Sequence, residues 1–233
     1  MRNLFRKIVT KLLLKHSQLV YAQSGEDLIL AQLFFKLDIL HPTYLDIGAN
    51  HPMYISNTYY FYMRGSKGVC IEPNPYLYQK IKKVRPRDTV LNVGIGITGE
   101  SAADFYLFPE HAHGLSTFSK EEAEYWQHTG MKKVGKIQYE KVIQVPLQTI
   151  NTVIRDNFQQ TPDFISIDVE GLDLQILQSL DFEAYAPLVL CVETLAYDEQ
   201  QREHKKDNII EYVKSKGYEV YADTHINTIF LRK

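Results

Sequence analysis

The chain has 233 residues (27.1 kDa), enough for one domain with a substantial core. Hydrophobic residues make up 45% and charged residues 23%, which excludes global disorder. Lys and Arg number 26 against 28 Asp and Glu, and this balance of −2 disfavours a nucleic-acid partner. The sequence has no run of 18 or more apolar residues, so we expect no transmembrane helix. The two cysteines, Cys70 and Cys191, stand in apolar runs, so we expect buried free thiols and a reducing, cytoplasmic location.

The first fifteen residues combine five basic residues with an apolar stripe at helical spacing. We expect an amphipathic helix over residues 1–20 and a single domain over residues 21–233. Packing of this helix on the domain, or on a second subunit of a homo-oligomer, is the favoured interpretation. The alternative is peripheral membrane contact through residues 1–15, because a basic face opposite Leu and Phe suits anionic headgroups. Lys11 interrupts the apolar stretch, which disfavours a secretory signal.

Strands and helices are predicted to alternate along the rest of the chain. The predicted strands cover residues 43–48, 68–73, 89–93, 163–169 and 188–193, and the predicted helices cover 53–64, 75–84, 172–180 and 200–216. This alternation predicts an α/β fold with a mainly parallel sheet and helices on both faces. The C-terminal segments YEVYAD and NTIFLRK predict a hairpin with an antiparallel strand at one edge. Residues 97–150 interrupt the pattern and are expected to form an insertion with extra strands and a mobile loop.

Acidic or amide side chains follow five successive predicted strands. They are Asp46 and Asn50, then Glu72, then Asn92, then Asp168 and Glu170, and finally Glu193. In a parallel sheet, ligands bind beyond the carboxyl ends of the strands. We therefore expect these side chains to surround a ligand.

The first two of these strand ends indicate a nucleoside ligand. Gly48 lets the backbone pass close to a ligand, and Glu72 is placed to accept the hydroxyls of a ribose. The full GxGxxG fingerprint is absent, which disfavours a dinucleotide. An adenosine ligand with cationic groups and no phosphate, such as S-adenosylmethionine, suits Glu72 together with Asp46.

Several linked motifs resemble the FkbM family of S-adenosylmethionine-dependent methyltransferases. They are YAQSGEDLIL, LDIGANHP, SNTYYFY, GVCIEPNP, VRPRD, LNVGIG, GLSTFS and FISIDVEGLDLQIL, in collinear order from Tyr21 to Glu193. The resemblance implies a class I methyltransferase (Rossmann-like) fold with a seven-stranded sheet and S-adenosylmethionine as cofactor. It also implies methylation of a hydroxyl on a sugar, glycan or sugar-bearing metabolite. His51 and Pro52 depart from the pattern, since many members have a glycine nearby.

The resemblance also implies which residues bind the cofactor. Asp46, Gly48 and Asn50 would line its methionine and sulfonium side, Glu72 would bind the ribose, Asn92 and Val93 would flank the adenine, and Gln23 and Glu26 would close over it. Two of these residues have structural alternatives. Asn50 can occupy a left-handed turn, and Glu26 can be a first-turn helix acid with Ser24 as the N-cap.

Carboxylates on the fourth and fifth strands are the candidates for catalysis. Methyl transfer to a hydroxyl needs a general base, and Asp168 and Glu170 share one face of an extended chain, where their proximity raises the pKa of one of them and makes it a plausible base. Glu193 lies one strand further, and Asp168 would also adjoin the cofactor. Alternatively, Asp168 holds a loop through backbone amides. His51 and His225 are weaker candidates for the base.

Two further features concern the acceptor. The insertion over residues 97–150 is expected to cover it, with Ser116 and Thr117 available to bind sugar hydroxyls. Asp168, Glu170 and Glu193 also offer the oxygen ligands that Mg²⁺ prefers. Because the chain has no Asp-Asp pair there and the resemblance does not require a metal, we predict no metal site.

Three other functions stay open at this point. The same base and pocket would serve N-methylation of an amino sugar or amide. The fold could be a non-catalytic binding module, in which case the acids would be structural. A dinucleotide-dependent oxidoreductase is the least favoured, for lack of the glycine fingerprint.

Overall fold

A computed structural model describes residues 17–97, 99–130, 135, 137–169, 171–197 and 203–233. Most of the expected N-terminal helix therefore lies outside the described residues. Residues 17–20 are exposed and not helical, so the prediction is wrong for these four. The carbonyl of Tyr21 accepts a hydrogen bond from Ser56 N (3.0 Å), which ties the lead-in chain to a loop of the domain.

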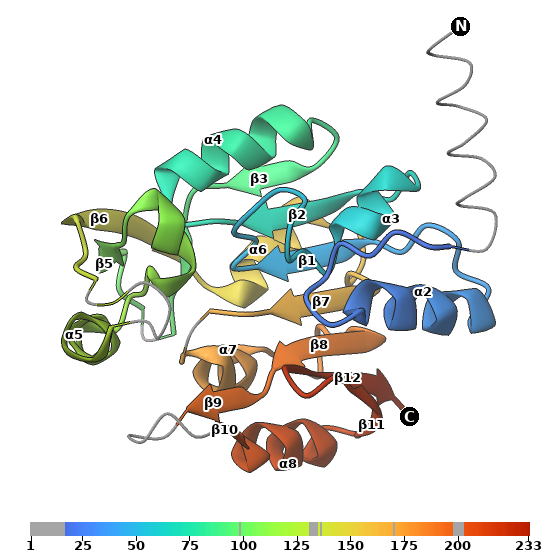
Figure 1. Cartoon of the computed structure of the whole chain (residues 1–233). Coiled ribbons are helices and arrows are strands. Elements are labelled where there is room, and N and C mark those ends of the chain that lie inside the picture. The colour runs from blue at the N-terminus through green and yellow to red at the C-terminus, as the bar shows by residue number, and fades with distance from the viewer. Residues whose placement is uncertain (1–16, 98, 131–134, 136, 170, 198–202) are drawn as a thin grey trace, which may run out of the picture.

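The central sheet has seven strands in the order β11-β12-β8-β7-β1-β2-β3 (Figure 1). They are β1 (Tyr44–Ile47), β2 (Gly68–Ile71), β3 (Thr89–Leu91), β7 (Phe164–Ile167), β8 (Val189–Glu193), β11 (Tyr218–Asp223) and β12 (Asn227–Arg232). Neighbours pair in parallel except β12, which runs antiparallel to β8 and to β11. The predicted seven-stranded, mainly parallel sheet with a terminal hairpin is confirmed.

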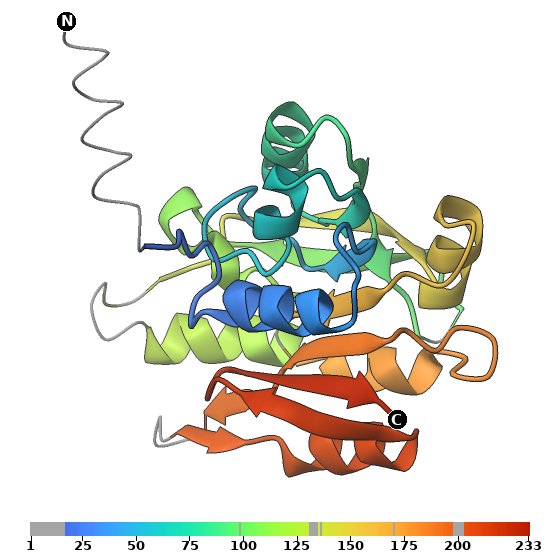
Figure 2. The same cartoon turned by 90° about the vertical axis from the view of Figure 1, so that its right-hand side faces the viewer.

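The position of the antiparallel strand differs from the prediction. β12 lies inside the sheet and β11 forms the edge, as Figure 2 shows. The chain leaves β8, crosses through α8 (Asp207–Ser215) and enters β11 beyond the place that β12 later fills. The hairpin then reverses the direction of β12, so that it pairs with β8 on one side and β11 on the other.

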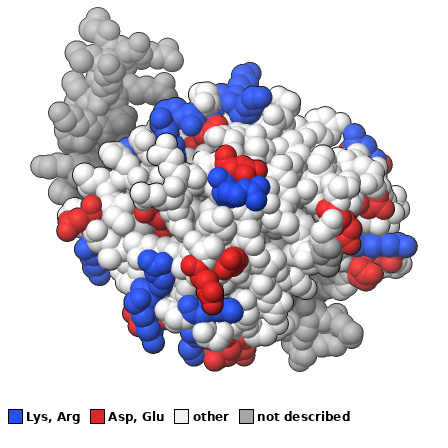
Figure 3. Space-filling view, turned by 180° about the vertical axis from the view of Figure 1, so that it is seen from behind, with Lys and Arg blue, Asp and Glu red and all other residues white. Residues whose placement is uncertain are grey.

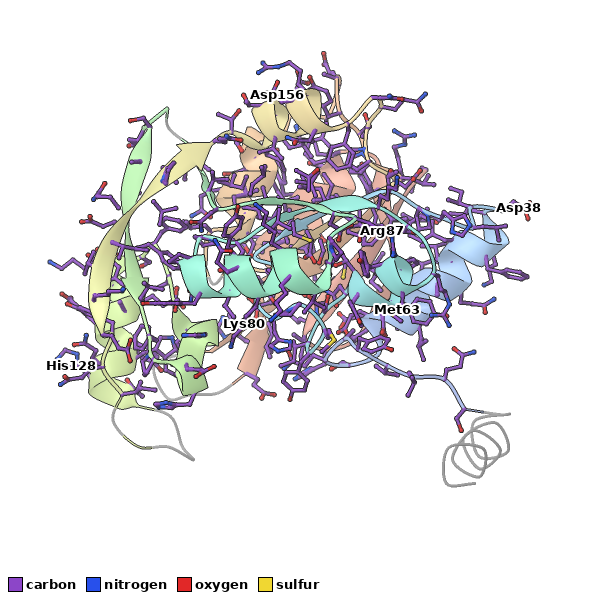
Figure 4. All side chains as sticks on the ribbon, turned by 90° about the horizontal axis from the view of Figure 1, so that it is seen from above. Asp38, Met63, Lys80, Arg87, His128 and Asp156 are labelled. Atoms are coloured by element: carbon purple, nitrogen blue, oxygen red, sulfur yellow. The ribbon has the colours of Figure 1, made fainter. Side chains whose placement is uncertain are left out.

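Helices cover both faces of this sheet. One face carries α6 (Ile150–Asn157), α7 (Asp173–Ser179) and α8, and the other carries α2 (Glu26–Lys36), α3 (Tyr59–Met63) and α4 (Pro75–Val84). In Figure 4, Asp156 of α6 and Met63 of α3 mark the opposite faces. Because both faces are covered, all residues of β1, β2 and β7 are buried, as expected for nearly continuous apolar strands.

Local sequence explains why one helix is predicted correctly and another is not. α4 has the predicted bounds, because Asn74 caps it by accepting from Tyr76 N and Pro75 occupies its first turn. The helix expected over residues 53–64 is only Tyr59–Met63. His51 Nδ1 accepts hydrogen bonds from the backbone of residues 53 and 54, and Ile55 has a φ of +54°, so this stretch forms a turn.

The insertion forms a second, three-stranded sheet with the order β4-β6-β5. Its elements are β4 (Gly94–Ile95), β5 (Ala102–Leu107), the 3₁₀ helix η1 (Glu110–Leu115), α5 (Lys120–Thr129) and β6 (Lys141–Gln148). The strand expected over residues 89–93 is thus shorter, because the chain leaves the central sheet after Leu91 and joins this sheet at Gly94. Figure 1 shows η1 and α5 on the side toward which the parallel strands point.

The helix predicted over residues 200–216 is wrong at its start. Glu203–Lys205 is a strand, β10, which pairs antiparallel with β9 (Leu195–Tyr197). Residues 198–202 lie outside the described residues.

The other global expectations concern thiols, membranes and charge. Cys70 and Cys191 are buried and free, as predicted. In the part of the chain that the structure describes, no helix is long and apolar enough to cross a membrane. On the face seen in Figure 3, acidic and basic residues are interspersed.

Candidate functional site

Three acids share one face of the sheet at the carboxyl ends of neighbouring strands. Side chains alternate between the faces of a strand, and Leu45 and Ile47 pack toward α6 to α8. Asp46 therefore points to the face that α2 and α3 cover. Phe164 and Cys191 pack on that face. Asp168 and Glu193 lie an even number of residues after them at the ends of the same strands, so their side chains point to the same face. The predicted convergence of strand-end acids is thus produced by the register of β1, β7 and β8.

Gly48 brings the turn after β1 against the end of β7. Its φ is +82°, and a Cβ atom at this position would lie 1.9 Å from the carbonyl oxygen of Asp168. The backbone N–H groups of Gly48 and Ala49 both donate to Ile71 O at the end of β2. Only glycine fits here, because a side chain would meet both backbone strain and a backbone atom.

Glu72, at the end of β2, faces this turn. Its Oε2 accepts from Asn50 N (2.7 Å) and its Oε1 from Asn74 N (2.8 Å). Burial raises the pKa of Glu72 to about 7, and these two bonds oppose that rise. Asn50 has a φ of +49°, so the left-handed turn considered for it is present. Asn92 donates its amide to the carbonyls of Glu72 and Pro73 (2.8 and 3.0 Å) and so supports the turn that carries the carboxylate. The neighbouring Val93 is buried in the core.

Asn74 is a site residue that sequence reasoning missed. It is fully buried, its Oδ1 caps α4, and its Nδ2 has no hydrogen-bond partner among the described residues. A buried amide donor without a partner is costly, which marks a place where a ligand atom can accept its hydrogen. The sequence signal that could have identified Asn74 was its position at a helix N-cap two residues after the strand-end acid Glu72.

Asp46 is held by a buried basic residue that was also missed. Its Oδ2 accepts from the hydroxyl of Thr58 and lies 3.8 Å from Arg85 Nη1. Burial raises the pKa of Asp46, whereas Arg85 and Thr58 lower it. Arg85 also pairs with Asp88 (2.8 Å) and donates to Tyr44 (3.1 Å), and its side chain is fully buried. It belongs to the VRPRD motif, for which the sequence suggested no role.

Asp168 accepts no hydrogen bond from any described residue. Burial raises its pKa well above the usual range, and the neighbouring carboxylates of Glu193 and Asp173 raise it further. These two acids are bound to one cation, since Lys206 Nζ lies 3.2 Å from Asp173 Oδ2 and 3.4 Å from Glu193 Oε2. Burial disfavours the charged lysine, yet the two carboxylates raise the pKa of Lys206 to about 12. Glu170, the predicted partner of Asp168, lies outside the described residues.

The insertion contributes a further acid, Glu122 of α5. Burial raises its pKa to about 7, Lys206 lowers it, and Glu193 and Asp173 raise it further. Its Oε2 would lie 3.0 Å from a Cβ at Gly171, so this helix reaches the loop that follows β7. Neither Glu122 nor Lys206 was predicted, because only the tertiary fold brings them to the strand ends.

The lead-in segment is bound to the C-terminal hairpin. Glu26 is fully buried, and its Oε1 accepts from Thr224 (2.6 Å) and from Asn227 Nδ2 (3.0 Å). Gly25, with a φ of +89°, caps α2 without a side-chain bond, so Ser24 is not the N-cap that was considered. Gln23 is exposed.

The remaining candidates are bound elsewhere. His51 uses Nδ1 to accept from Met53 N and Tyr54 N, and His225 is exposed with its Nε2 2.8 Å from Glu203. Ser116 accepts from the backbone of Phe108, and Thr117 is buried and accepts from Ser119 N. Within the described ranges, no three His, Cys, Asp or Glu side chains are arranged to hold a metal ion.

No curated protein sequence matches the chain. Among solved structures, a TehB-like SAM-dependent methyltransferase from Corynebacterium glutamicum aligns at 10% identity and a TM-score of 0.45, over 99% of this chain and 97% of that one. Magnesium protoporphyrin IX methyltransferase from Synechocystis PCC 6803 aligns at 8% identity and 0.45, over 89% and 78%. Precorrin-6y C5,15-methyltransferase from Geobacter metallireducens aligns at 13% identity and 0.45, over 93% and 92%.

The family of the chain is identified from its sequence. A family model of the methyltransferase FkbM domain matches residues 46–220, from the acid of β1 to the edge strand β11. This range contains the Gly48 turn, Glu72, Asp168 and Glu193. The chain therefore belongs to the FkbM methyltransferase family and is an enzyme that uses S-adenosylmethionine.

Proposed function

We propose that the enzyme methylates a hydroxyl of a sugar, glycan or sugar-bearing metabolite, with Asp168 as the general base. The observation that carries the proposal is the carboxylate of Asp168, which is free of hydrogen bonds within the described structure and has a raised pKa. The backbone carbonyl of Asp168 packs against Gly48, so Asp168 lies next to the turn that is expected to bind the cofactor. A base of raised pKa at that position suits removal of the proton of a weakly acidic alcohol.

The residues around the turn fit S-adenosylmethionine. Gly48 leaves room for close backbone approach, Glu72 offers carboxylate lone pairs to two ribose hydroxyls, and Asn74 Nδ2 needs an acceptor. Asp46 contributes negative charge on the side expected for the methionine end, and Asn50, Asn92 and Val93 complete the lining in this proposal. The bound cofactor supplies an electrophilic methyl group on a sulfonium.

The protein's own groups prepare the acceptor. Asp168 accepts the hydroxyl proton as the new bond forms. Lys206 holds Glu193 and Asp173 and keeps the surroundings of Asp168 from accumulating uncompensated negative charge. α5, through Glu122, covers this end of the sheet and limits the access of water. Glu26 and Gln23 close the site from the lead-in side, with Glu26 fixed by the C-terminal hairpin.

The test separates cofactor binding from transfer. Calorimetric titration with S-adenosylhomocysteine is combined with transfer of labelled methyl from S-adenosylmethionine to a panel of free monosaccharides and oligosaccharides. Asp168→Asn should bind S-adenosylhomocysteine within about twofold of wild type and lose transfer by about 10²–10⁴-fold. Glu72→Gln is the matched variant, in which S-adenosylhomocysteine binding should weaken but stay measurable. Transfer at the wild-type rate by Asp168→Asn would refute the assigned base.

A second candidate function is N-methylation of an amino sugar. It is favoured by the carboxylates of Asp168, Asp173, Glu193 and Glu122, which outnumber the amine of Lys206 that they interact with and would attract a substrate ammonium. Mass-spectrometric location of the methyl group on oxygen or nitrogen decides between the two.

A further inference from the structure

A patch of exposed apolar side chains lies where the lead-in chain meets the loop after the cofactor turn. It consists of Leu19, Val20, Met53, Tyr54 and Ile55, with exposed fractions of 59, 47, 39, 69 and 39%. The two segments are joined by the bond from Ser56 N to Tyr21 O and by the edge-on contact of the Tyr21 and Tyr59 rings (4.8 Å between centroids). We call these five residues the apolar patch.

The exposure of the loop half of the patch is fixed by the backbone. His51 Nδ1 accepts from Met53 N and Tyr54 N and so holds the turn. Ile55 has a φ of +54°, a conformation that a β-branched residue adopts only under strain. Ile55 is 39% exposed and belongs to none of the hydrophobic core clusters of the described residues, so core packing does not account for the strain. Strain that packing does not explain indicates a functional segment.

The chain that leads into the patch has a strongly biased charge. Residues 1–16 contain five Lys or Arg residues and no Asp or Glu, although the whole chain carries a net charge of −2. Apolar side chains next to a basic segment match the two layers of an anionic membrane surface, which are the acyl boundary and the negative headgroups. The same charge disfavours pairing of two copies through the patch, because a twofold interface would bring both basic segments together.

We propose that the apolar patch docks the enzyme on an anionic lipid bilayer. The patch follows Gly48 and Asn50 by only a few residues, so docking would place the cofactor-binding side of the enzyme at the membrane surface. This inference is independent of which acceptor is methylated.

The experiment is co-sedimentation of the full chain with vesicles of phosphatidylcholine and phosphatidylglycerol, compared with phosphatidylcholine alone. The patch variant is Met53→Ser/Tyr54→Ser/Ile55→Asn. The matched control is Phe35→Ser/Leu40→Ser, which removes two more exposed apolar side chains (67 and 72%) at the far end of α2.

The expected result is binding of wild type to the anionic vesicles, loss of that binding by about tenfold or more in the patch variant, and a change below about twofold in the control. Ile55→Asn alone should weaken vesicle binding while the melting temperature stays the same or rises, because asparagine tolerates the left-handed conformation. This combination distinguishes loss of docking from loss of folding.

Three outcomes would overturn the proposal. The first is that wild type fails to sediment with anionic vesicles. The second is that the patch variant binds like wild type while deletion of residues 1–16 abolishes binding, which would assign the contact to the N-terminal segment alone. The third is that light scattering finds a dimer that the patch variant loses, in which case a second copy covers the patch.

Discussion

Replacing Arg85 with methionine is expected to destabilise the enzyme strongly, because the side chain is buried among the acids that it binds. The guanidinium is fully buried and pairs with Asp88 at 2.8 Å, donates to Thr58 at 2.8 Å and to Tyr44 at 3.1 Å, and lies 3.8 Å from Asp46. Methionine has a similar length, so the change removes the charge and the donors and leaves little cavity.

The size of the stability loss follows from the carboxylates that stay buried without their cation. Removing one partner of a buried ion pair costs about 3–5 kcal/mol, because the other partner stays buried without compensation. Here two carboxylates, Asp46 and Asp88, lose the same cation. For a domain of this size, each kcal/mol lowers the melting temperature by about 2–4 °C, so we expect a decrease of about 6–20 °C.

The loss should depend on pH in a defined direction. Burial already raises the pKa of Asp46 in the folded protein, and removing Arg85 removes an opposing influence and raises it further. A carboxyl whose pKa is higher in the folded than in the unfolded state costs stability as the pH rises through the folded value. The deficit of Arg85→Met relative to wild type should therefore be larger at pH 8 than at pH 5.

The assay is denaturant unfolding at pH 5 and pH 8, with two companion variants. Arg85→Lys keeps the charge and should recover part of the loss. Arg87→Met removes an exposed arginine of the same motif, which contacts the ring and carbonyl of Tyr62, and should cost about 1 kcal/mol or less. Equal losses for Arg85→Met and Arg87→Met, or a loss that does not change with pH, would refute the reasoning.

Three further predictions concern the cofactor and acceptor ends of the site. Gly48→Ala should weaken S-adenosylhomocysteine binding by at least about tenfold in calorimetry, since its Cβ would lie 1.9 Å from Asp168 O at a positive φ; unchanged affinity would contradict the close approach. Glu72 has a pKa of about 7, so the affinity of wild type for S-adenosylhomocysteine should rise by about tenfold from pH 6 to pH 8 as the carboxylate ionises. Glu72→Gln should abolish this rise, and a parallel pH profile in the variant would count against the ribose role. Lys206→Met should lower the free energy of unfolding by about 1–3 kcal/mol, and more at pH 8 than at pH 5, because the pKa of Glu193 is already raised and loses its cation; denaturant titrations showing the reverse order would contradict this.

Much of the fold could be read from local patterns. Strands buried on both faces need nearly continuous apolar residues, and VCI and FISI have them, with Ser166 as the one polar residue. The bounds of α4 follow from Asn74 and Pro75, whose capping chemistry acts within a few residues. Asp46, Glu72, Asp168 and Glu193 converge because parallel strands end at one edge, which topology guarantees once the strands are identified.

Other features had no local signal. β10 consists of Glu203–Lys205, a charged stretch that is a strand because β9 pairs with it. The place of β12 inside the sheet depends on the crossover through α8, which the sequence of the hairpin does not encode.

The sequence by itself determined the class of fold and the acids that line the strand ends, because both depend on spacing along the chain, and its family motifs indicated the cofactor. Only the tertiary structure decided how those acids are charged and held. It brought Arg85 to Asp46, and Lys206 and Glu122 to the acids after β7 and β8, across distances in sequence that no local pattern spans. The physical reason is that a buried carboxylate takes its pKa from desolvation and from neighbouring charges, and both are properties of the packed interior.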